Sequence, residues 1–167
     1  MELNNSELAK RAKKIKLLIM DCDGVLTDGR LYFSADGEEL KVFNVKDGQG
    51  IVLWHEAGFK SAIISGRESK IVNRRATELG ITYIRQGSFD KTRCFSEILK
   101  EEDILPDEVA YIGDDIGDID LLKVVGFPVA VADAMEKLFP YTLYKTRMKG
   151  GYGAVRELID LLLNLKM

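Results

Sequence analysis

The feature that most restricts the fold of this chain is a regular alternation of short apolar runs with longer amphipathic segments. Apolar runs of strand length lie at residues 15–20, 61–65, 82–86, 109–113 and 128–132. Segments with apolar residues near helical spacing lie at residues 47–57, 68–79, 89–101, 115–125 and 152–166. Strands that are apolar along their whole length are typical of a parallel sheet covered by helices on both faces. The alternation therefore predicts a three-layer α/β fold with a Rossmann-like parallel sheet.

A single segment interrupts this alternation, directly after the first apolar run. Residues 29–45 contain two strand-like arms around Asp36 and Gly37, a pair that favours a tight turn. We therefore expect a β-hairpin inserted into the α/β fold. The chain of 167 residues fits one domain, residues 1–167, and leaves no room for a separate cap domain.

The charge and composition of the chain argue against two classes of partner. Its formal net charge is −3, which gives no general attraction to nucleic acid or to anionic lipid. The basic cluster at residues 10–16 is typical of an exposed helix face, and no apolar run approaches the roughly 18 residues of a membrane span. Cys22 and Cys94 have neither metal-binding nor redox spacing. We therefore expect a protein of the reducing cytoplasm, without nucleic-acid or membrane partners.

Polar side chains follow the expected strands at their carboxyl ends, where open α/β sheets bind their ligands. If the strands lie side by side, these side chains converge on one small volume. They are Asp21 and Asp23 after the first strand, Ser65 and Arg67 after the second, Lys91 at the helix that follows the third, and Asp114, Asp115 and Asp118 after the fourth. The sequence therefore predicts an acidic site with a few cations at this edge of the sheet.

An acidic site of this kind suits phosphoryl transfer. Clustered carboxylates repel one another unless a cation neutralises them, and Mg²⁺ prefers carboxylate, carbonyl and water oxygens. Such a cation and an adjacent lysine stabilise phosphate charge. An aspartate such as Asp21 can be a nucleophile, and a carboxylate two residues later, Asp23, can serve as general acid and base.

Some of these residues have simpler interpretations when each is taken alone. Asp114 and Asp115 could favour a helix N-terminus through the helix dipole, and Ser65 could be a helix N-cap. Lys46 and Asp47 could be a pair at the end of a strand. Each of these alternatives explains one position, but none explains why polar groups follow several strands in turn.

Other kinds of catalytic site do not fit the chain. His55 is the only histidine, and it lies within an expected helix, so a Ser-His-Asp site is unsupported. A cysteine-dependent phosphatase loop would need an arginine six residues after its cysteine. Asp28 occupies that position after Cys22, and Lys100 occupies it after Cys94.

The polar segments resemble, in order along the chain, the four signature motifs of the haloacid dehalogenase superfamily. The matching segments are DCDGVLTD at residues 21–28, ISGR at 64–67, Lys91, and IGDDIGD at 112–118. The resemblance covers essentially the whole chain and implies a Mg²⁺-dependent enzyme. The implied roles are Asp21 as nucleophile and Mg²⁺ ligand, Asp23 as general acid and base with a metal-binding backbone carbonyl, Ser65 and Lys91 as partners of the phosphoryl group, Asp114 as the remaining Mg²⁺ ligand, and Asp115 and Asp118 as holders of Lys91 or of metal-bound water.

Within the superfamily, the chain resembles the 3-deoxy-D-manno-octulosonate 8-phosphate (KDO 8-phosphate) phosphatases. The resemblance includes the hairpin, FNVKDGQGI at residues 43–51 and GGYGAVRE at residues 150–157. It implies hydrolysis of KDO 8-phosphate through an aspartyl-phosphate intermediate, in lipopolysaccharide precursor synthesis, by a homotetramer joined through the hairpins. The substrate-binding residues that it implies are Lys46, Asp47, Arg67 and Arg156.

Other functions stay open at this point. A phosphatase for a nine-carbon acid sugar, such as sialic acid 9-phosphate or its deaminated relative KDN 9-phosphate, fits the same residues. A phosphotransferase that uses an acceptor other than water also fits them. An alternative of another class is a non-catalytic assembly module that keeps the fold, and the intact set of Asp21, Asp23, Lys91 and Asp114 argues against it.

Overall fold

The structure is a computed structural model that describes residues 5–37 and 39–167. At its centre lies a six-stranded sheet in which every neighbouring pair of strands is parallel. The strands are β1 (Leu17–Met20), β4 (Lys60–Ile64), β5 (Tyr83–Arg85), β6 (Val109–Gly113), β7 (Phe127–Ala130) and β8 (Tyr144–Lys145). They lie in the order β5-β4-β1-β6-β7-β8, so β1 has a central position.

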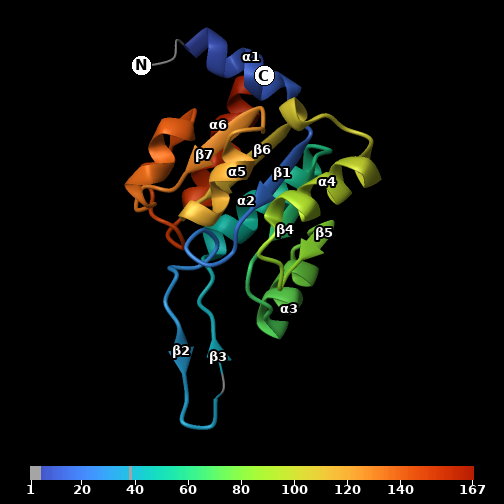
Figure 1. Ribbon diagram of the computed structural model, residues 1–167. Coiled ribbons are helices and arrows are strands. Elements are labelled where there is room, and N and C mark those ends of the chain that lie inside the picture. The colour runs from blue at the N-terminus through green and yellow to red at the C-terminus, as the bar shows by residue number, and fades with distance from the viewer. Residues whose placement is uncertain (1–4, 38) are drawn as a thin grey trace.

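Helices cover both faces of this sheet (Figure 1). They are α1 (Asn5–Lys14), α2 (Val45–Glu56), α3 (Lys70–Glu78), α4 (Lys91–Glu102), α5 (Ile119–Leu122) and α6 (Ala154–Lys166). Helices α2 and α6 pack together on one face, and α4 and α5 lie on the other. All residues of β1, β6 and β7 are buried as a result. This architecture confirms the predicted three-layer α/β fold. Within the described residues, no helix combines the length and the apolar character needed to cross a bilayer.

The register of the central strands decides which side chains meet at the edge of the sheet. Met20 at the end of β1 pairs with Ile63 on β4 and with Ile112 on β6. The three strands therefore end at the same level. This brings Asp21, which follows β1, next to Asp114, which follows β6.

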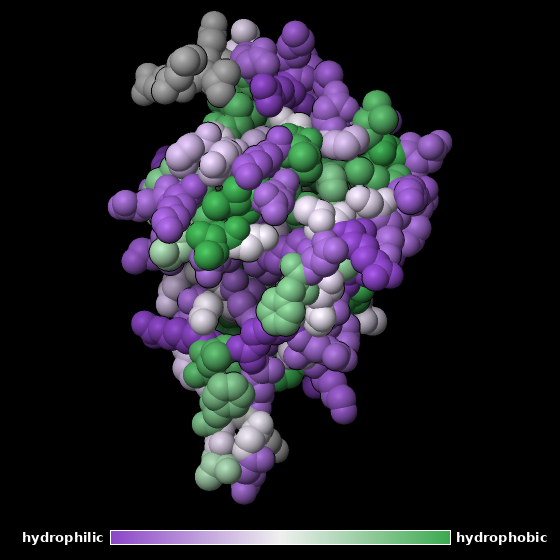
Figure 2. All heavy atoms as spheres, viewed as in Figure 1, coloured by the Kyte–Doolittle hydropathy of each residue, from purple (hydrophilic) through white to green (hydrophobic). Residues whose placement is uncertain are grey.

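The inserted hairpin is confirmed as a separate two-stranded sheet that projects from the body (Figure 1). Its antiparallel strands are β2 (Tyr32–Phe33) and β3 (Glu39–Leu40), and Gly37 between them has a φ of +80°, a conformation that favours glycine. Figure 2 shows apolar side chains over this projection, below the body. The large exposed ones include Leu31, Phe33, Leu40 and Val42. A two-stranded arm with apolar side chains in water is a candidate surface for association.

The structure corrects the helix expected at residues 115–125. This segment forms a 3₁₀ turn, Ile116–Asp118, followed by the four residues of α5. The physical reason is that Asp118 turns inward, where its carboxylate accepts backbone N–H groups at the end of β6. A long helix starting at residue 115 would point this side chain elsewhere.

Two smaller expectations also needed correction. Val45, expected as the last residue of the hairpin, is the first residue of α2, because Asn44 caps the helix by accepting the N–H of Lys46. The strand β8 was not predicted, since two residues carry no periodic pattern.

Candidate active site

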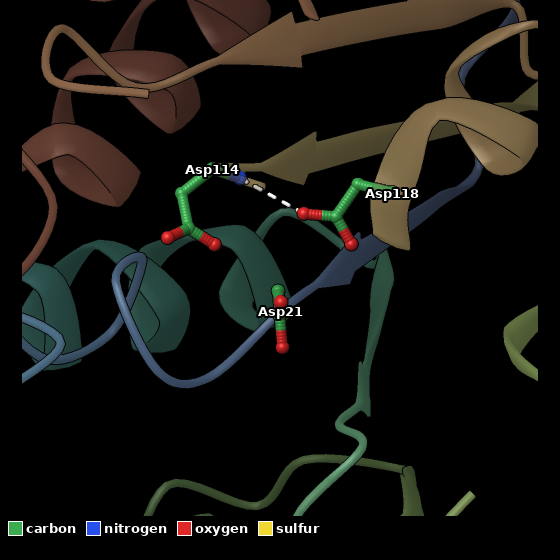
Figure 3. Close-up of side chains that lie close together, drawn as sticks. All are labelled: Asp21, Asp114 and Asp118. Atoms are coloured by element: carbon green, nitrogen blue, oxygen red, sulfur yellow. Dashed lines mark hydrogen bonds between the residues drawn. The ribbon is translucent and has the colours of Figure 1, made fainter. Parts of the chain in front are cut away.

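Asp21 continues β1 by one residue and presents its carboxylate at the edge of the sheet (Figure 3). Its backbone N–H donates to the carbonyl of Ile112 on β6 at 3.1 Å. One carboxylate oxygen accepts the N–H of Cys22 at 2.6 Å, and the other accepts Lys91 Nζ at 2.7 Å. Cys22 itself is fully buried in the core, where burial raises the pKa of its thiol. The alternation of the strand thus directs an acid to the site and a thiol to the core.

Lys91, the first residue of α4, connects two of the acids. Its Nζ lies 2.7 Å from Asp21 Oδ2 and 2.6 Å from Asp118 Oδ1. Burial alone would lower the pKa of this ammonium group, but the charges of Asp21 and Asp118 outweigh burial and raise it. Lys91 is therefore a fixed cation beside Asp21.

Asp118 is the fully buried acid that holds this cation in place. Its Oδ1 accepts the hydroxyl of Tyr111 at 2.6 Å as well as Lys91 Nζ. Its Oδ2 accepts the backbone N–H of Asp114 at 2.9 Å and that of Asp115 at 3.2 Å. With four donors, the carboxylate of Asp118 is satisfied within the protein.

Asp114, at the end of β6, offers a carboxylate that accepts no hydrogen bond or ion pair from the described residues. Gly24 makes room for it, because a Cβ at this position would lie 2.0 Å from Asp114 Oδ2. The φ of Gly24 is +86°, which also favours glycine. Carboxylate oxygens of Asp21, Asp114 and Asp118 all lie within 4.8 Å of one another (Figure 3).

These neighbouring acids raise one another's pKa. Burial and the charge of Asp118 raise the pKa of Asp21 to about 6, although Lys91 opposes the shift. Burial and the charges of Asp21 and Asp118 raise the pKa of Asp114 to about 8. One lysine does not neutralise three carboxylates, whereas a hard divalent cation bound through oxygen does. Because Asp118 is already satisfied, Asp21 and Asp114 are the acids whose side chains could hold such a metal.

Asp23 belongs to a second group of charges, which involves the hairpin. Its carboxylate contacts Lys41 Nζ and lies 3.7 Å from Arg67 Nε. Glu39 of β3 completes the group, at 3.4 Å from Lys41 Nζ and 2.8 Å from Arg67. The returning arm of the hairpin therefore reaches the site.

A cavity of about 360 Å³ opens between the two groups of charges, and Asp21, Asp23, Lys91 and Asp114 are among the residues that line it. Ser65 lines it too, buried at the end of β4, and is not a helix N-cap, since α3 is preceded by Ser69. Asp115 is exposed, and its carboxylate accepts the backbone N–H of Ile116 rather than a hydrogen bond from Lys91. Two exposed apolar side chains, Leu31 and Phe89, also line the cavity.

Comparison with known protein families agrees with this arrangement. A family model for haloacid dehalogenase-like hydrolases matches residues 61–158, more than half of the chain. This chain is a haloacid dehalogenase-like hydrolase.

Individual members of the family are similar over nearly the whole chain. The 3-deoxy-D-manno-octulosonate 8-phosphate phosphatase KdsC of Escherichia coli (strain K12) is 48% identical over 159 residues, which are 95% of this chain and 85% of that protein. The crystal structure of the phosphatase of the same name from Yersinia pestis has a TM-score of 0.94 and 48% identity, covering 96% of this chain and 86% of that one. The enzyme from Moraxella catarrhalis, whose structure contains a magnesium ion, a phosphate ion and a KDO molecule, has a TM-score of 0.94 and 40% identity, covering 96% and 92%.

In this haloacid dehalogenase-like hydrolase, Asp47 lies outside the cavity of Asp21 and is only 2% exposed. Its carboxylate accepts the N–H of Gly153 at 3.2 Å and that of Arg156 at 2.8 Å. Gly153 is the N-cap of α6 and has no side chain to offer, so Asp47 caps α6 from the neighbouring helix. The contacts of Asp47 are those of a structural residue, and its role as a substrate contact stays a prediction.

The other residues expected on the substrate side fall into two places. Arg67 lines the cavity of Asp21. Lys46 and Arg156 instead line a separate cavity of about 400 Å³ beside α6, where Arg156 pairs with Asp160 at 2.8 Å. Within one chain, the structure does not bring these two residues to Asp21.

The glycine-rich segment before α6 packs against the loop that follows Asp23. The N–H of Gly151 donates to the carbonyl of Val25 at 2.8 Å. A Cβ on Gly150 would lie 1.6 Å from the carbonyl oxygen of Gly24, so only glycine permits this approach. The segment therefore supports the loop that carries the acids.

Sequence reasoning missed three polar residues around the site. Tyr111 was interpreted as core because it lies within a buried strand, yet its hydroxyl donates to Asp118, and burial and that charge raise its pKa. Lys41 and Glu39 fell within the expected hairpin and were given no role at the site. The only available indication was that Lys41 interrupts an apolar arm.

Proposed function

We propose that this protein is a Mg²⁺-dependent phosphatase that hydrolyses KDO 8-phosphate to KDO and inorganic phosphate. The observation that carries the proposal is the pair of Asp21 and Lys91, 2.7 Å apart beside the carboxylate of Asp114, in a cavity large enough for a sugar phosphate. The 48% identity to a KDO 8-phosphate phosphatase over 95% of the chain supports the substrate. The product would supply lipopolysaccharide precursor synthesis.

The chemistry begins at Asp21. Its carboxylate attacks the phosphorus, the bond to the sugar oxygen breaks, and an aspartyl phosphate forms. Asp23 donates a proton to the departing sugar oxygen, and it then takes a proton from the water that hydrolyses the aspartyl phosphate. Lys91 and Ser65 bind oxygens of the phosphoryl group and hold it in line. Hydrolysis releases inorganic phosphate and restores the carboxylate of Asp21.

The metal would be held by the carboxylates of Asp21 and Asp114 and by the backbone carbonyl of Asp23. When bound, Mg²⁺ neutralises the neighbouring acids and withdraws charge from the phosphoryl oxygens. Asp118, through its hydrogen bond to Lys91 Nζ, keeps that cation beside Asp21. A role for Asp115 in holding metal-bound water is part of the same proposal, supported by its place in the cavity lining.

We also propose that a single domain, residues 1–167, assembles through its hairpin into a homotetramer in the cytoplasm. The exposed apolar side chains of Leu31, Phe33, Leu40 and Val42 support association through the hairpin. In such an assembly Lys46 and Arg156 would serve a neighbouring site, while Arg67 would meet the sugar carboxylate in its own. Light scattering at micromolar concentration tests this, and a fully active monomer would contradict it.

Phosphate release from a panel of acid-sugar phosphates, in the presence of Mg²⁺, tests the function. We expect the highest kcat/KM on KDO 8-phosphate, and lower values on KDN 9-phosphate and sialic acid 9-phosphate. An Asp21→Asn variant is the matched control for contaminating phosphatases. A higher kcat/KM on a nine-carbon acid-sugar phosphate would make that compound, and not KDO 8-phosphate, the substrate. No phosphate release from any ester would favour a non-catalytic module.

A further inference from the structure

Lys41 is a hairpin lysine whose side chain is only 2% exposed. Its Nζ contacts the carboxylate of Asp23 and lies 3.4 Å from Glu39. Among the described residues that line the cavity of Asp21, Asp23 is present but Lys41 and Glu39 are not. Lys41 therefore reaches the reacting groups only through Asp23.

We propose that Lys41 is a positioning residue for Asp23: it ties the hairpin to this carboxylate and orients it for proton transfer to and from the substrate. The inference rests on the proposed function, because it takes Asp23 to be the general acid and base. It adds a residue that lies outside the signature motifs and does not touch the substrate.

Orientation matters because proton transfer requires donor and acceptor atoms at hydrogen-bond distance, about 2.6–3.2 Å apart. The side chain of Asp23 is 23% exposed, so close packing does not fix the rotation of its carboxylate. Lys41 contacts Oδ1, and Arg67 Nε lies 3.7 Å from Oδ2. Two cations on different oxygens restrict the plane of the carboxylate, and the shorter contact is that of Lys41.

The charges of this group also explain how a lysine remains buried at the site. Asp23 and Glu39 supply two negative charges, and Lys41 and Arg67 supply two positive ones. The group is therefore neutral, and each cation contacts both acids within 4.0 Å. Since Glu39 and Lys41 belong to the same returning arm, a contact that holds the hairpin also holds Asp23.

The experiment compares Lys41→Met with the unaltered protein on two esters that differ in their need for an acid. For KDO 8-phosphate, whose sugar oxygen leaves with a proton, we expect kcat to fall about 100-fold while KM changes less than about threefold. For p-nitrophenyl phosphate, nitrophenolate leaves without a proton. The rapid first release of nitrophenolate should therefore fall less than about threefold, and only the later turnover should slow.

Two further variants complete the design. Lys60→Met removes an ion pair to Glu102 at an exposed position and should leave both substrates unaffected. Glu39→Gln keeps the shape of its side chain while weakening its contact to Lys41, so it should show the same pattern more weakly. It takes the place of Lys41→Met if that variant does not fold. In an Asp23→Asn background, Lys41→Met should cost less than about threefold, because the residue through which it acts is gone.

Each contrary result has a separate meaning. Equal losses in the first step on both esters would indicate a general structural role and overturn the proposal. A higher KM with unchanged kcat would make Lys41 a substrate contact instead, and unchanged kinetics would make the contact irrelevant. If the unaltered protein prefers another alkyl phosphate, the substrate proposal fails, and the same comparison is made with that ester.

Discussion

The acids Asp21 and Asp114, at the edge of the sheet, and the buried acid Asp47 differ in what surrounds their carboxylates. Asp47 is 2% exposed and accepts backbone N–H groups at the start of α6. Asp21 and Asp114 face one another and Asp118, and the carboxylate of Asp114 accepts no hydrogen bond from the described residues. Burial raises the pKa in both places, but like charges add to the effect only for Asp21 and Asp114 at the edge of the sheet.

This difference separates a structural acid from a functional one better than burial does. A buried carboxylate with several N–H partners has its interactions completed by the fold. A buried carboxylate surrounded by other carboxylates is costly until a cation arrives, so it indicates a site for chemistry. Substitution of Asp21 should therefore lower activity and leave the fold intact, whereas substitution of Asp47 should lower the free energy of unfolding.

The largest expected effect is that of Asp21→Asn on activity. An amide cannot form the aspartyl phosphate, so we expect kcat/KM for KDO 8-phosphate to fall by about 10⁴-fold or more. The fold should persist, because Asp118 still holds Lys91 and one repulsive charge is removed. Phosphate release together with circular dichroism measures both. Substantial activity in the folded variant would remove Asp21 from the nucleophile role.

The next effect concerns Mg²⁺ and its dependence on pH. In the metal-free protein, Asp21 and Asp114 hold protons up to pKa values of about 6 and about 8, whereas unfolded aspartates ionise near about 4. Between about pH 4 and about pH 8, the folded state binds more protons at these two acids than the unfolded state does. The contribution of the two acids to the free energy of unfolding therefore falls as the pH rises through this range. Mg²⁺ binds the ionised acids, so its stabilising effect should grow over the same range.

Thermal unfolding with and without Mg²⁺ measures this effect. At about pH 8, and at about 100 times the dissociation constant that applies there, Mg²⁺ should add about 2.7 kcal/mol to the free energy of unfolding. At the same Mg²⁺ concentration, the gain should be clearly smaller near about pH 5.5. Asp114→Asn should lose most of the gain, while Asp160→Asn, which alters a partly exposed acid on α6, should keep it. The same gain at both pH values would argue against Asp21 and Asp114 as the ligands.

Asp47→Ala tests the other side of the comparison. It leaves N–H groups at the start of α6 without acceptors, and we expect the free energy of unfolding to fall by about 2 kcal/mol. Asp47→Asn retains one acceptor oxygen and should lose less. Chemical denaturation measures the loss, and kinetics on the folded fraction measure KM. A large rise in KM without a loss of stability would restore Asp47 as a substrate contact.

The sequence predicted the elements whose pattern is local. Continuous apolar runs located the strands, and the rule that ligands bind at strand ends brought Asp21, Lys91 and Asp114 to one edge of the sheet. The pair Asp36-Gly37 located the hairpin, because its turn depends on adjacent residues.

What the sequence could not predict depends on contacts between distant segments. Asp47 and Gly153 are 106 positions apart, and only the packing of α2 on α6 shows that one caps the other. Lys41 and Asp23 are 18 positions apart across the hairpin base, where no periodic pattern applies. The inward turn of Asp118 replaced a helix by a 3₁₀ turn for the same reason, since its partners include Lys91 on another element.

The smallest expected effect comes from Asp160→Ala, which removes the acid that pairs with Arg156 one turn along α6. This pair is partly exposed, and ion pairs of this spacing contribute about 0.3–0.5 kcal/mol. The free energy of unfolding should therefore fall far less than in Asp47→Ala, although both acids contact the same segment of the chain. If Arg156 binds substrate at the site of a neighbouring subunit, the loss of its ion pair to Asp160 should alter KM and leave kcat unchanged. Kinetics measured at protein concentrations at which the tetramer is assembled test this. A loss of stability as large as that of Asp47→Ala would show that burial and N–H partners do not distinguish the two acids.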